Sequence, residues 1–478
     1  MTLNSFSFLL YFTVLVAVLF VLQLFRRNEK NVWITTRLQI WMLLFFSFFF
    51  ICKSDWRFCI CVVAVTLLAY LFGRLIDGKR SKLILSAGII LLVLFLAYFK
   101  YTNFFVTSFK SIAGLGSVTI NIILPIGISF YIFSALSYLI DVFRGDYPAE
   151  KNILHFALYI AFFPKLTAGP IVRGKHFFPQ VKEYRGTQWE PFKAGIQIFV
   201  FGLFKKIVLA DHLGVFVDDV FHAPIAFNTG TVILAAVSYS LQIYFDFSGY
   251  SDMAIGVSKI LGFDFKPNFN LPYLSQNVSE FWKRWHISLS SWFQDYLYIP
   301  LGGSRKGEVR TYINLMLVML ISGLWHGAGW TFIIWGALHG IASCVNKAFG
   351  KKLKALGSWV NGIITFIFVT LFRVVFRADS FSTAVKVWTG MFTAHTGISQ
   401  PYTWSFFAIV CLIAGTIVAW RHSKKIGKQD KAGKLIIDGF YPLLDLSKFW
   451  NQVVFFTFCG LTIIMGYFGD TAFIYGKF

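Results

Sequence analysis

Long apolar runs dominate the chain, and most extend over about twenty consecutive positions, as residues 6–25 and 402–420 illustrate. A helix of that length matches the hydrocarbon thickness of a bilayer, roughly 30 Å at 1.5 Å per residue. The pattern predicts an all-α, polytopic integral membrane protein with about eleven transmembrane helices. The predicted segments lie near 5–25, 38–52, 57–73, 82–104, 119–140, 194–220, 231–257, 311–345, 358–377, 403–420 and 452–469.

Two stretches do not fit a simple span. Residues 153–164 are apolar but too short to cross, and a Gly/Pro break follows at 165–173, so a re-entrant segment is predicted. Residues 267–305 mix aromatic side chains with Lys283, Arg284 and Asp295, which indicates re-entrant or interfacial amphipathic helices. We expect one membrane domain over 1–478, with N-terminal helices at 1–110, a core at 111–345 and C-terminal helices at 346–478.

Composition and charge agree with this architecture. The chain is 57% hydrophobic and 14% charged, whereas soluble proteins carry about 25% charged residues, which excludes an ordinary soluble enzyme. The net charge of +22 is better explained by basic cytoplasmic loops than by nucleic-acid binding. Basic residues are denser in the first and third loops than in the second, so the N-terminus is predicted outside. A last basic cluster is predicted to anchor the cytoplasmic side: Arg421, Lys424, Lys425, Lys428, Lys431 and Lys434.

His326 is the strongest candidate for chemistry. It lies near the middle of the apolar stretch 311–345, where ionisable residues are costly and often functional. Gly323, Gly327 and Gly329 leave room for a ligand or another backbone to approach. Burial disfavours the charged imidazolium, so the ring is expected to be neutral and able to accept a proton. The alternative is a structural histidine bonded to a neighbouring helix.

His286 is a second candidate. If residues 282–289 form one helix, Trp282, His286 and Leu289 share a face, and Lys283 and Arg284 point away from it. A histidine beside such a basic patch suits a site where a phosphorylated donor meets the membrane, although simple packing among tryptophans explains it equally well. His339 is interpreted as a helix-packing residue.

Asp246 and Asp252 are the acidic candidates for a functional or ion-pairing role within the apolar segments. A buried carboxylate needs a cation or hydrogen-bond donors. Ion pairs with basic residues of 165–175 or 283–284 are favoured over direct catalysis. The six cysteines lie in apolar runs and are interpreted as packing residues, so neither a disulfide nor a metal site is predicted.

Four motifs carry a family resemblance. Residues 244–253 (YFDFSGYSDM), 281–290 (FWKRWHISLS), 295–303 (DYLYIPLGG) and 323–328 (GLWHGA) resemble the membrane-bound O-acyltransferase family, in its alginate O-acetyltransferase membrane-subunit branch. Residues 162–170, 376–378 and the Phe-Ile-Tyr of 473–475 extend the likeness. The sequence departs from the branch in two places. It has Trp-Lys-Arg before Trp285, where two arginines are more usual, and it ends in Gly-Lys-Phe; the second difference bears on partner docking.

The resemblance implies a ring of tilted helices around a thin central catalytic core, with His326 as the family's invariant histidine and His286 as its second, less uniform position. It implies an O-acetyltransferase of the bacterial cytoplasmic (inner) membrane that uses acetyl-CoA and no metal. The residues expected to hold the donor's phosphates are Lys165, Arg173, Lys175, Lys283 and Arg284. The implied partners are the lipid bilayer, an extracytoplasmic SGNH or serine hydrolase-like acetyltransferase and a polysaccharide synthase or secretion complex, with O-acetylation of a secreted or cell-wall polysaccharide as the outcome.

Three alternatives remain at this point. A D-alanyl transferase for teichoic acid takes its acyl group from a carrier protein. A proton-coupled transporter uses membrane histidines and aspartates as a relay. A purely structural secretion subunit needs none of these side chains. The acetylated polymer, and the role of histidine as general base or covalent nucleophile, also stay open.

Overall fold

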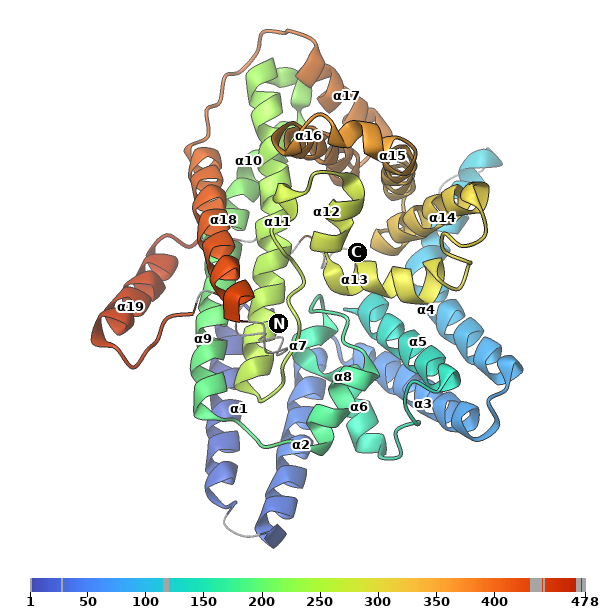
Figure 1. Ribbon diagram of the computed structural model, residues 1–478, viewed down its shortest axis with the longest axis vertical. Helices are drawn as coiled ribbons and strands as arrows, with labels where there is room; N and C mark the ends of the chain where they lie inside the picture. The colour runs from blue at the N-terminus through green and yellow to red at the C-terminus, as the bar shows by residue number, and fades with distance from the viewer. Residues whose placement is uncertain are drawn as a thin grey trace. The chain divides into compact units, whose positions relative to one another are not determined.

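Helices form the described part of the chain, which comprises residues 2–26, 29–114, 120–429, 441, 443–469 and 474 of a computed structural model (Figure 1). Within those residues there is no β-strand beyond one isolated bridge between Phe227 and Ile398, so the predicted all-α class is confirmed. The contacts divide the chain into a first unit, Met1–Phe199 with Met253–Phe265, and a second unit, Val200–Asp252 with Lys266–Phe478.

The first unit contains four long helices and several short ones. The long helices are α1 (Phe6–Leu24), α2 (Glu29–Cys52), α3 (Trp56–Lys79) and α4 (Lys82–Ile112); the others are α5 (Ile128–Arg144), α6 (Ile153–Ala161), α7 (Phe163–Leu166), α8 (Gly174–Lys182) and most of α9 (Trp189–Leu203). Helix α5 begins later than the predicted 119, because Gly127 has a left-handed φ of 71° and lies against the Leu166 carbonyl.

The short buried helices α6, α7 and α8 confirm that 153–182 does not span. Asn152 caps α6 by accepting from the Leu154 N–H at 2.9 Å. The turns between these helices are lined with rings: Phe162 lies 4.8 Å from Phe263, and Phe177 stacks on Phe263 at 5.3 Å between centroids. Irregular backbone is therefore enclosed by protein.

The second unit holds the remaining elements. They are a π-helical turn η1 (Phe204–Ala210), α10 (Asp211–His222), η2 (Pro224–Ala226), most of α11 (Thr229–Ile260), η3 (Pro272–Leu274), α12 (Val278–Arg284), α13 (Ile287–Phe293), η4 (Gln294–Tyr298), α14 (Glu308–His326), α15 (Trp330–Lys354), α16 (Ser358–Arg377), α17 (Phe381–Phe392), α18 (Thr403–Gln429) and α19 (Phe449–Ile464). The short helices α12 and α13 agree with the amphipathic segment predicted at 267–305.

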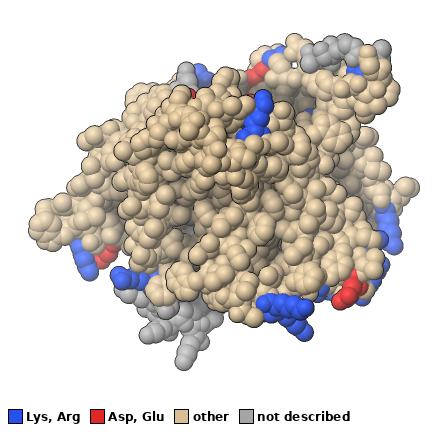
Figure 2. Space-filling model, turned by 90° about the horizontal axis from the view of Figure 1, so that it is seen from above, with Lys and Arg blue, Asp and Glu red and all other residues tan. Residues whose placement is uncertain are grey.

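Eight helices of the described residues are long and apolar enough to cross a membrane, namely α1 to α4, α11, α15, α16 and α18. They differ in burial, because α11 is largely enclosed by protein whereas most of α18 is exposed. Figure 2 shows a face on which charged side chains are sparse, as lipid contact requires. The chain is therefore a multi-pass membrane protein. Lys431 and Lys434 of the predicted basic anchor, and residues 473 and 475 of the tail motif, lie outside the described residues.

The apolar stretch 311–345 is two helices, not one. Helix α14 ends at His326, residues 327–329 turn, and α15 begins at Trp330. The two helices pack with almost no side chain between them: a Cβ on Gly323 would lie 2.2 Å from the Phe332 carbonyl oxygen, and one on Gly336 would lie 2.4 Å from that of Met319. The glycines near His326 thus allow close helix packing.

We expect Gly336→Val to prevent this packing, because the added branches would overlap the Met319 carbonyl. The variant should lose monodisperse protein in detergent and melt well below the wild type. The matched control is Gly362→Val on α16, where an added Cβ would meet nothing within 4 Å. Equal melting of the Gly336 variant and the wild type would contradict this account of the hairpin.

Candidate functional site

His326 occupies the last position of α14, at the turn into α15. Its side chain is buried, with the residue 1% exposed. The imidazole meets three rings edge-on: Trp325 and Trp335, each 5.0 Å away between centroids, and Phe376 at 5.5 Å. His326 does lie near the middle of the apolar stretch 311–345, but at a turn between two helices rather than within one span, because α14 ends at His326. Gly327 offers no space for a ligand, since the Phe332 ring lies where its Cβ would be.

His286 lies at the junction of α12 and α13 and is fully buried. Its φ of 44° is in the left-handed region, so the predicted single helix over 282–289 is wrong: α12 ends at Arg284 and α13 begins at Ile287. The Nδ1 atom lies 3.3 Å from Oδ1 of Asn268, and the ring packs 4.6 Å from Phe247. Burial lowers the pKa of His286 to about 3, which keeps the ring neutral at physiological pH.

Tryptophan rings connect the histidines of the second unit. Trp325 lies between His286 and His326, at 5.9 and 5.0 Å between centroids. Trp335 lies between His326 and His339, at 5.0 and 4.8 Å. His339 therefore belongs to the same cluster, although the sequence suggested only packing. All of its members are buried, so they form a water-poor aromatic lining around His326.

His339 is held in a defined orientation. The indole Nε1–H of Trp282 donates to its Nδ1 at 3.3 Å, so a neutral His339 carries its proton on Nε2. Ser343, one turn further along α15, donates its hydroxyl to the His339 carbonyl at 2.8 Å. A fixed tautomer is the arrangement that acid–base chemistry needs from a supporting histidine.

Arg373 of α16 is the charged residue that the sequence reasoning missed. It is 4% exposed, and its Nη1 donates to the Ser240 carbonyl at 3.2 Å and to the Tyr273 hydroxyl. Its guanidinium carbon lies 4.3 Å from the Trp285 ring centroid. Trp285 directly precedes His286, so this cation–π contact stabilises the turn that carries the second histidine. An arginine inside the apolar segment 358–377 was a visible signal for such a role.

A cavity of about 340 Å³ lies beside the histidine cluster. Lys283 lines its exposed side, and Ser322 lines it one helical turn before His326. Trp282 and Ser343, which both donate hydrogen bonds to His339, also line it. The cavity thus joins a surface cation to the buried neighbourhood of His326 within one unit.

The five residues predicted to hold donor phosphates fall into two groups. Lys283 and Arg284 belong to the second unit with both histidines; Lys283 is exposed, and Arg284 pairs with Glu280 at 2.9 Å. Lys165, Arg173 and Lys175 belong to the first unit, where only Lys175 is exposed. Lys165 is 3% exposed, with its ammonium 4.4 Å from the Tyr159 ring. Burial lowers its pKa to about 7, which makes a buried Lys165 a poor candidate for holding a phosphate.

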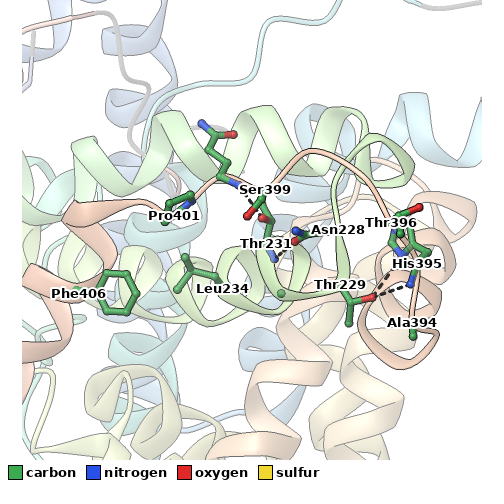
Figure 3. Close-up of a pocket in the computed structure, with 12 residues that line it drawn as sticks. Asn228, Thr229, Thr231, Leu234, Ala394, His395, Thr396, Ser399, Pro401 and Phe406 are labelled. Carbon is green, nitrogen blue, oxygen red and sulfur yellow. Dashed lines mark hydrogen bonds between the residues drawn. The ribbon is translucent and has the colours of Figure 1, made fainter.

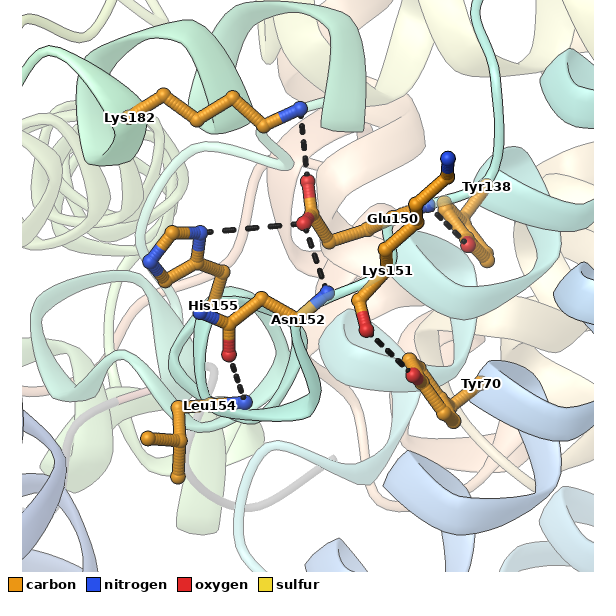
Figure 4. Close-up of polar contacts among 8 residues, drawn as sticks. All are labelled: Tyr70, Tyr138, Glu150, Lys151, Asn152, Leu154, His155 and Lys182. Atoms are coloured by element: carbon orange, nitrogen blue, oxygen red, sulfur yellow. Dashed lines mark hydrogen bonds and ion pairs between the residues drawn. The ribbon is translucent and has the colours of Figure 1, made fainter.

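Glu150 anchors the segment that leads to the short helices of the first unit (Figure 4). Its carboxylate accepts from the Asn152 N–H at 3.0 Å and pairs with Lys182 of α8, also at 3.0 Å. The Nδ1 atom of His155 lies 3.9 Å from the carboxylate oxygen that accepts from the Asn152 N–H. The contacts tie the start of α6 to the end of α8, and so fix the helix on which Lys175 is carried.

Asp246 and Asp252 have different partners from those predicted. Lys206 lies 2.8 Å from Asp246 and 2.6 Å from Asp211, and Lys205 lies 2.5 Å from Asp252. Both lysines belong to the π-helical turn η1, within the apolar segment 194–220. Ion pairing was therefore the correct role, but the predicted cation segments, 165–175 and 283–284, were wrong.

This charged cluster also holds residues from the C-terminal part of the chain. The Tyr441 hydroxyl donates to Asp252 at 2.8 Å, and the Ile474 backbone N–H donates to Asp246 at 2.9 Å. Carboxylates whose oxygens are shared in this way serve structure, because their charge is already balanced by local donors.

Comparisons with known proteins cover the part of the chain that holds the candidate site. A sequence model of the membrane-bound O-acyltransferase family matches residues 148–377, a range that contains every histidine and every lysine and arginine described above for the site. A Pseudomonas putida protein named probable alginate O-acetylase AlgI is 45% identical over 352 residues, covering 71% of this chain and 72% of the relative.

Two further relatives have other acceptors in their names. The peptidoglycan O-acetyltransferase of Helicobacter pylori is 40% identical over 344 residues, which are 66% of this chain and 65% of that protein. The teichoic acid D-alanyltransferase of Bacillus subtilis is 31% identical over 283 residues, which are 55% and 70% of the two chains. The identity is higher to the two O-acetyl-transferring relatives than to the D-alanyl-transferring one.

Proposed function

This chain belongs to the membrane-bound O-acyltransferase family and is a membrane O-acetyltransferase; on that premise we propose that it takes acetyl from cytoplasmic acetyl-CoA and delivers it to an extracytoplasmic partner acetyltransferase. The final product would be an O-acetylated secreted or cell-wall polysaccharide. The observation that carries the proposal is the buried His326, grouped with His286 and beside a cavity that has Lys283 on its exposed side. The alginate and peptidoglycan O-acetylating relatives support the acceptor class.

The chemistry proposed for His326 needs a neutral ring in a water-poor pocket. As general base, its unprotonated nitrogen takes the proton of the acceptor hydroxyl while that oxygen attacks the thioester carbonyl; the C–S bond then breaks and the thiolate leaves and is protonated. As nucleophile, the same nitrogen would first accept the acetyl group and pass it on. The buried indole N–H groups around the ring are suited to stabilise the oxyanion. Exclusion of water protects the acetyl group from hydrolysis.

The cavity beside the cluster supports a route for the donor. Its serine-lined wall offers hydrogen bonds to the amide groups of the pantetheine arm, and Lys283 offers a cation for the phosphates. Lys175, exposed in the first unit, is the second proposed phosphate contact. Because acetyl-CoA is cytoplasmic, this route also supports placement in the inner membrane of a bacterium.

Neutralising these two lysines is expected to weaken donor binding without removing the catalytic group. Lys283→Gln and Lys175→Gln should each raise the KM for acetyl-CoA by about three- to tenfold with kcat little changed, since a lost phosphate contact affects ground and transition states alike. Exposed Lys386 on α17 supplies the control variant Lys386→Gln. An unchanged KM in both variants would move the donor site elsewhere.

The whole proposal is tested with the chain in sealed proteoliposomes, with labelled acetyl-CoA on one side and a purified partner acetyltransferase on the other. Acetyl label on the partner, dependent on acetyl-CoA, supports the proposal. Label that depends instead on a charged acyl carrier protein would indicate the D-alanyl transferase alternative. Proton flux without any acetylated product would indicate a transporter.

A further inference from the structure

A second cavity, of about 540 Å³, lies elsewhere in the second unit (Figure 3). It is formed where the start of α11 meets the loop between α17 and α18, residues 393–402. The volume falls in the range of small-molecule sites, roughly 300–1,000 Å³. The His286–His326 cluster shares no residue with it, so it is not the donor cavity described above.

The distribution of lysines and arginines assigns this cavity to the extracytoplasmic face. The end of α15 carries Lys347, Lys351, Lys352 and Lys354, and the end of α18 is also basic, which places both on the cytoplasmic side. Helices α16 and α18 are each long and apolar enough to cross the membrane once, which puts the segment that joins their other ends, 378–402 with α17, outside. That segment contains one lysine, Lys386, and no arginine.

The walls of the cavity are held in place by backbone contacts. Residues 226–228 and Ile398 exchange two backbone hydrogen bonds of 2.9 and 3.1 Å. The Thr231 hydroxyl accepts from the Gln400 N–H at 3.0 Å, and the Thr229 hydroxyl donates to the Thr393 carbonyl at 2.8 Å. A loop fixed in this way presents its remaining side chains at low entropic cost, which favours ligand binding.

The lining is neutral and rich in hydrogen-bonding groups. None of its twelve residues is Lys, Arg, Asp or Glu. The side chains of Thr396, Ser399 and Gln400 make no hydrogen bond to other described residues, so their hydroxyl and amide groups are available to a ligand. Phe406, which is more than half exposed, adds an aromatic face beside them.

We propose that this cavity binds a neutral, hydroxyl-rich saccharide segment at the extracytoplasmic face, as part of the polymer that the partner acetyltransferase finally acetylates; the inference thus rests on the proposed function. Hydroxyl and amide groups pair with sugar hydroxyls, and the Phe406 ring can cover the apolar face of a pyranose ring. A polyuronate would need cations to balance its carboxylates, and the lining has no lysine or arginine; the Nδ1 atom of its one histidine, His395, faces the Thr229 hydroxyl and the Thr393 carbonyl. A protein partner would be expected to meet several aromatic or Arg anchors, whereas Phe406 is the one such residue in this lining.

Direct binding to the full chain in nanodiscs, without acetyl-CoA, tests the inference. The probes are a neutral cello-hexaose and a mannuronate hexamer. Binding of each probe is measured by saturation-transfer NMR and by calorimetry. Cello-hexaose is expected to bind, with the dissociation constant raised about tenfold in Ser399→Ala/Gln400→Ala, as two lost hydrogen bonds predict. Phe406→Ala should weaken binding independently, whereas Ser382→Ala, an exposed serine on α17 outside the cavity, should not.

Three outcomes would overturn the inference. They are preferential binding of the mannuronate hexamer, absence of binding to both probes, and loss of partner-protein binding rather than saccharide binding in Ser399→Ala/Gln400→Ala. Saccharide binding is measured without acetyl-CoA and also in His326→Ala. The binding result is therefore independent of whether the chain transfers acetyl. Saccharide binding by a chain that transfers no acetyl group would contradict the proposed function alone.

Discussion

Replacing His326 by Ala is expected to lower acetyl transfer by about 10²- to 10⁴-fold, the usual contribution of a positioned general base. The loss should fall on kcat rather than on the KM for acetyl-CoA, because His326 lies one helical turn beyond Ser322, the nearest residue lining the donor cavity on α14. The measurement is initial-rate transfer of labelled acetyl to the partner in proteoliposomes.

Two controls separate chemistry from structure in this experiment. His326→Gln preserves much of the side-chain volume between Trp325, Trp335 and Phe376 but cannot act as the base, so it should be as inactive as the alanine variant. His222→Ala removes an exposed histidine of α10 and should keep wild-type rates. Full transfer by His326→Gln would remove His326 from the mechanism and favour the structural alternative.

Replacing Lys206 by Met is expected to cause the largest loss of stability, about 3–5 kcal/mol, because it leaves Asp211 and Asp246 buried without their shared cation. Thermal or denaturant unfolding of the purified chain in detergent measures the loss. Adding Asp211→Asn and Asp246→Asn to Lys206→Met should recover most of it, since a neutral buried set avoids the uncompensated charge.

An exposed ion pair provides the matched control. Lys448 lies 3.9 Å from Asp445 with both side chains more than half exposed, so Lys448→Met should change stability by about 0–1 kcal/mol. Similar losses for Lys206→Met and Lys448→Met would show that burial does not set the strength of the η1 cluster.

The sequence predicted the architecture well where one local pattern was sufficient. Most of the long apolar runs indicated helices that are long and apolar enough to span, although those at 119–140, 194–220 and 452–469 form shorter helices. The broken segment 153–182 indicated the short helices α6 to α8. The hydropathy of 311–345 predicted one segment where the structure has two helices. A turn of three residues does not lower the average hydropathy, and the division follows from tertiary packing, in which Gly323 contacts Phe332.

The site was harder to predict, because its geometry depends on residues far apart in the chain. His286 and His326 were identified from their local motifs, but the tryptophan contacts that bring His339 beside them depend on tertiary packing. The partners of Asp246 and Asp252 were missed for the same reason. Lys205 and Lys206 lie within an apolar segment about forty residues earlier in the chain, and the sequence does not show that this segment contacts the two aspartates. The proposed roles of the phosphate-binding lysines stay predictions.

The left-handed backbone of His286 complicates any mutational study of this residue. Most side chains are strained at a φ of 44°, at a cost of about 1–3 kcal/mol, whereas Asn and Gly tolerate that region better. Replacing His286 by alanine would therefore strain the turn between α12 and α13 and remove the imidazole at the same time. An inactive variant would not show which of the two changes caused the loss of activity. His286→Asn separates them, so libraries built on this enzyme need position-specific replacements at this one joint.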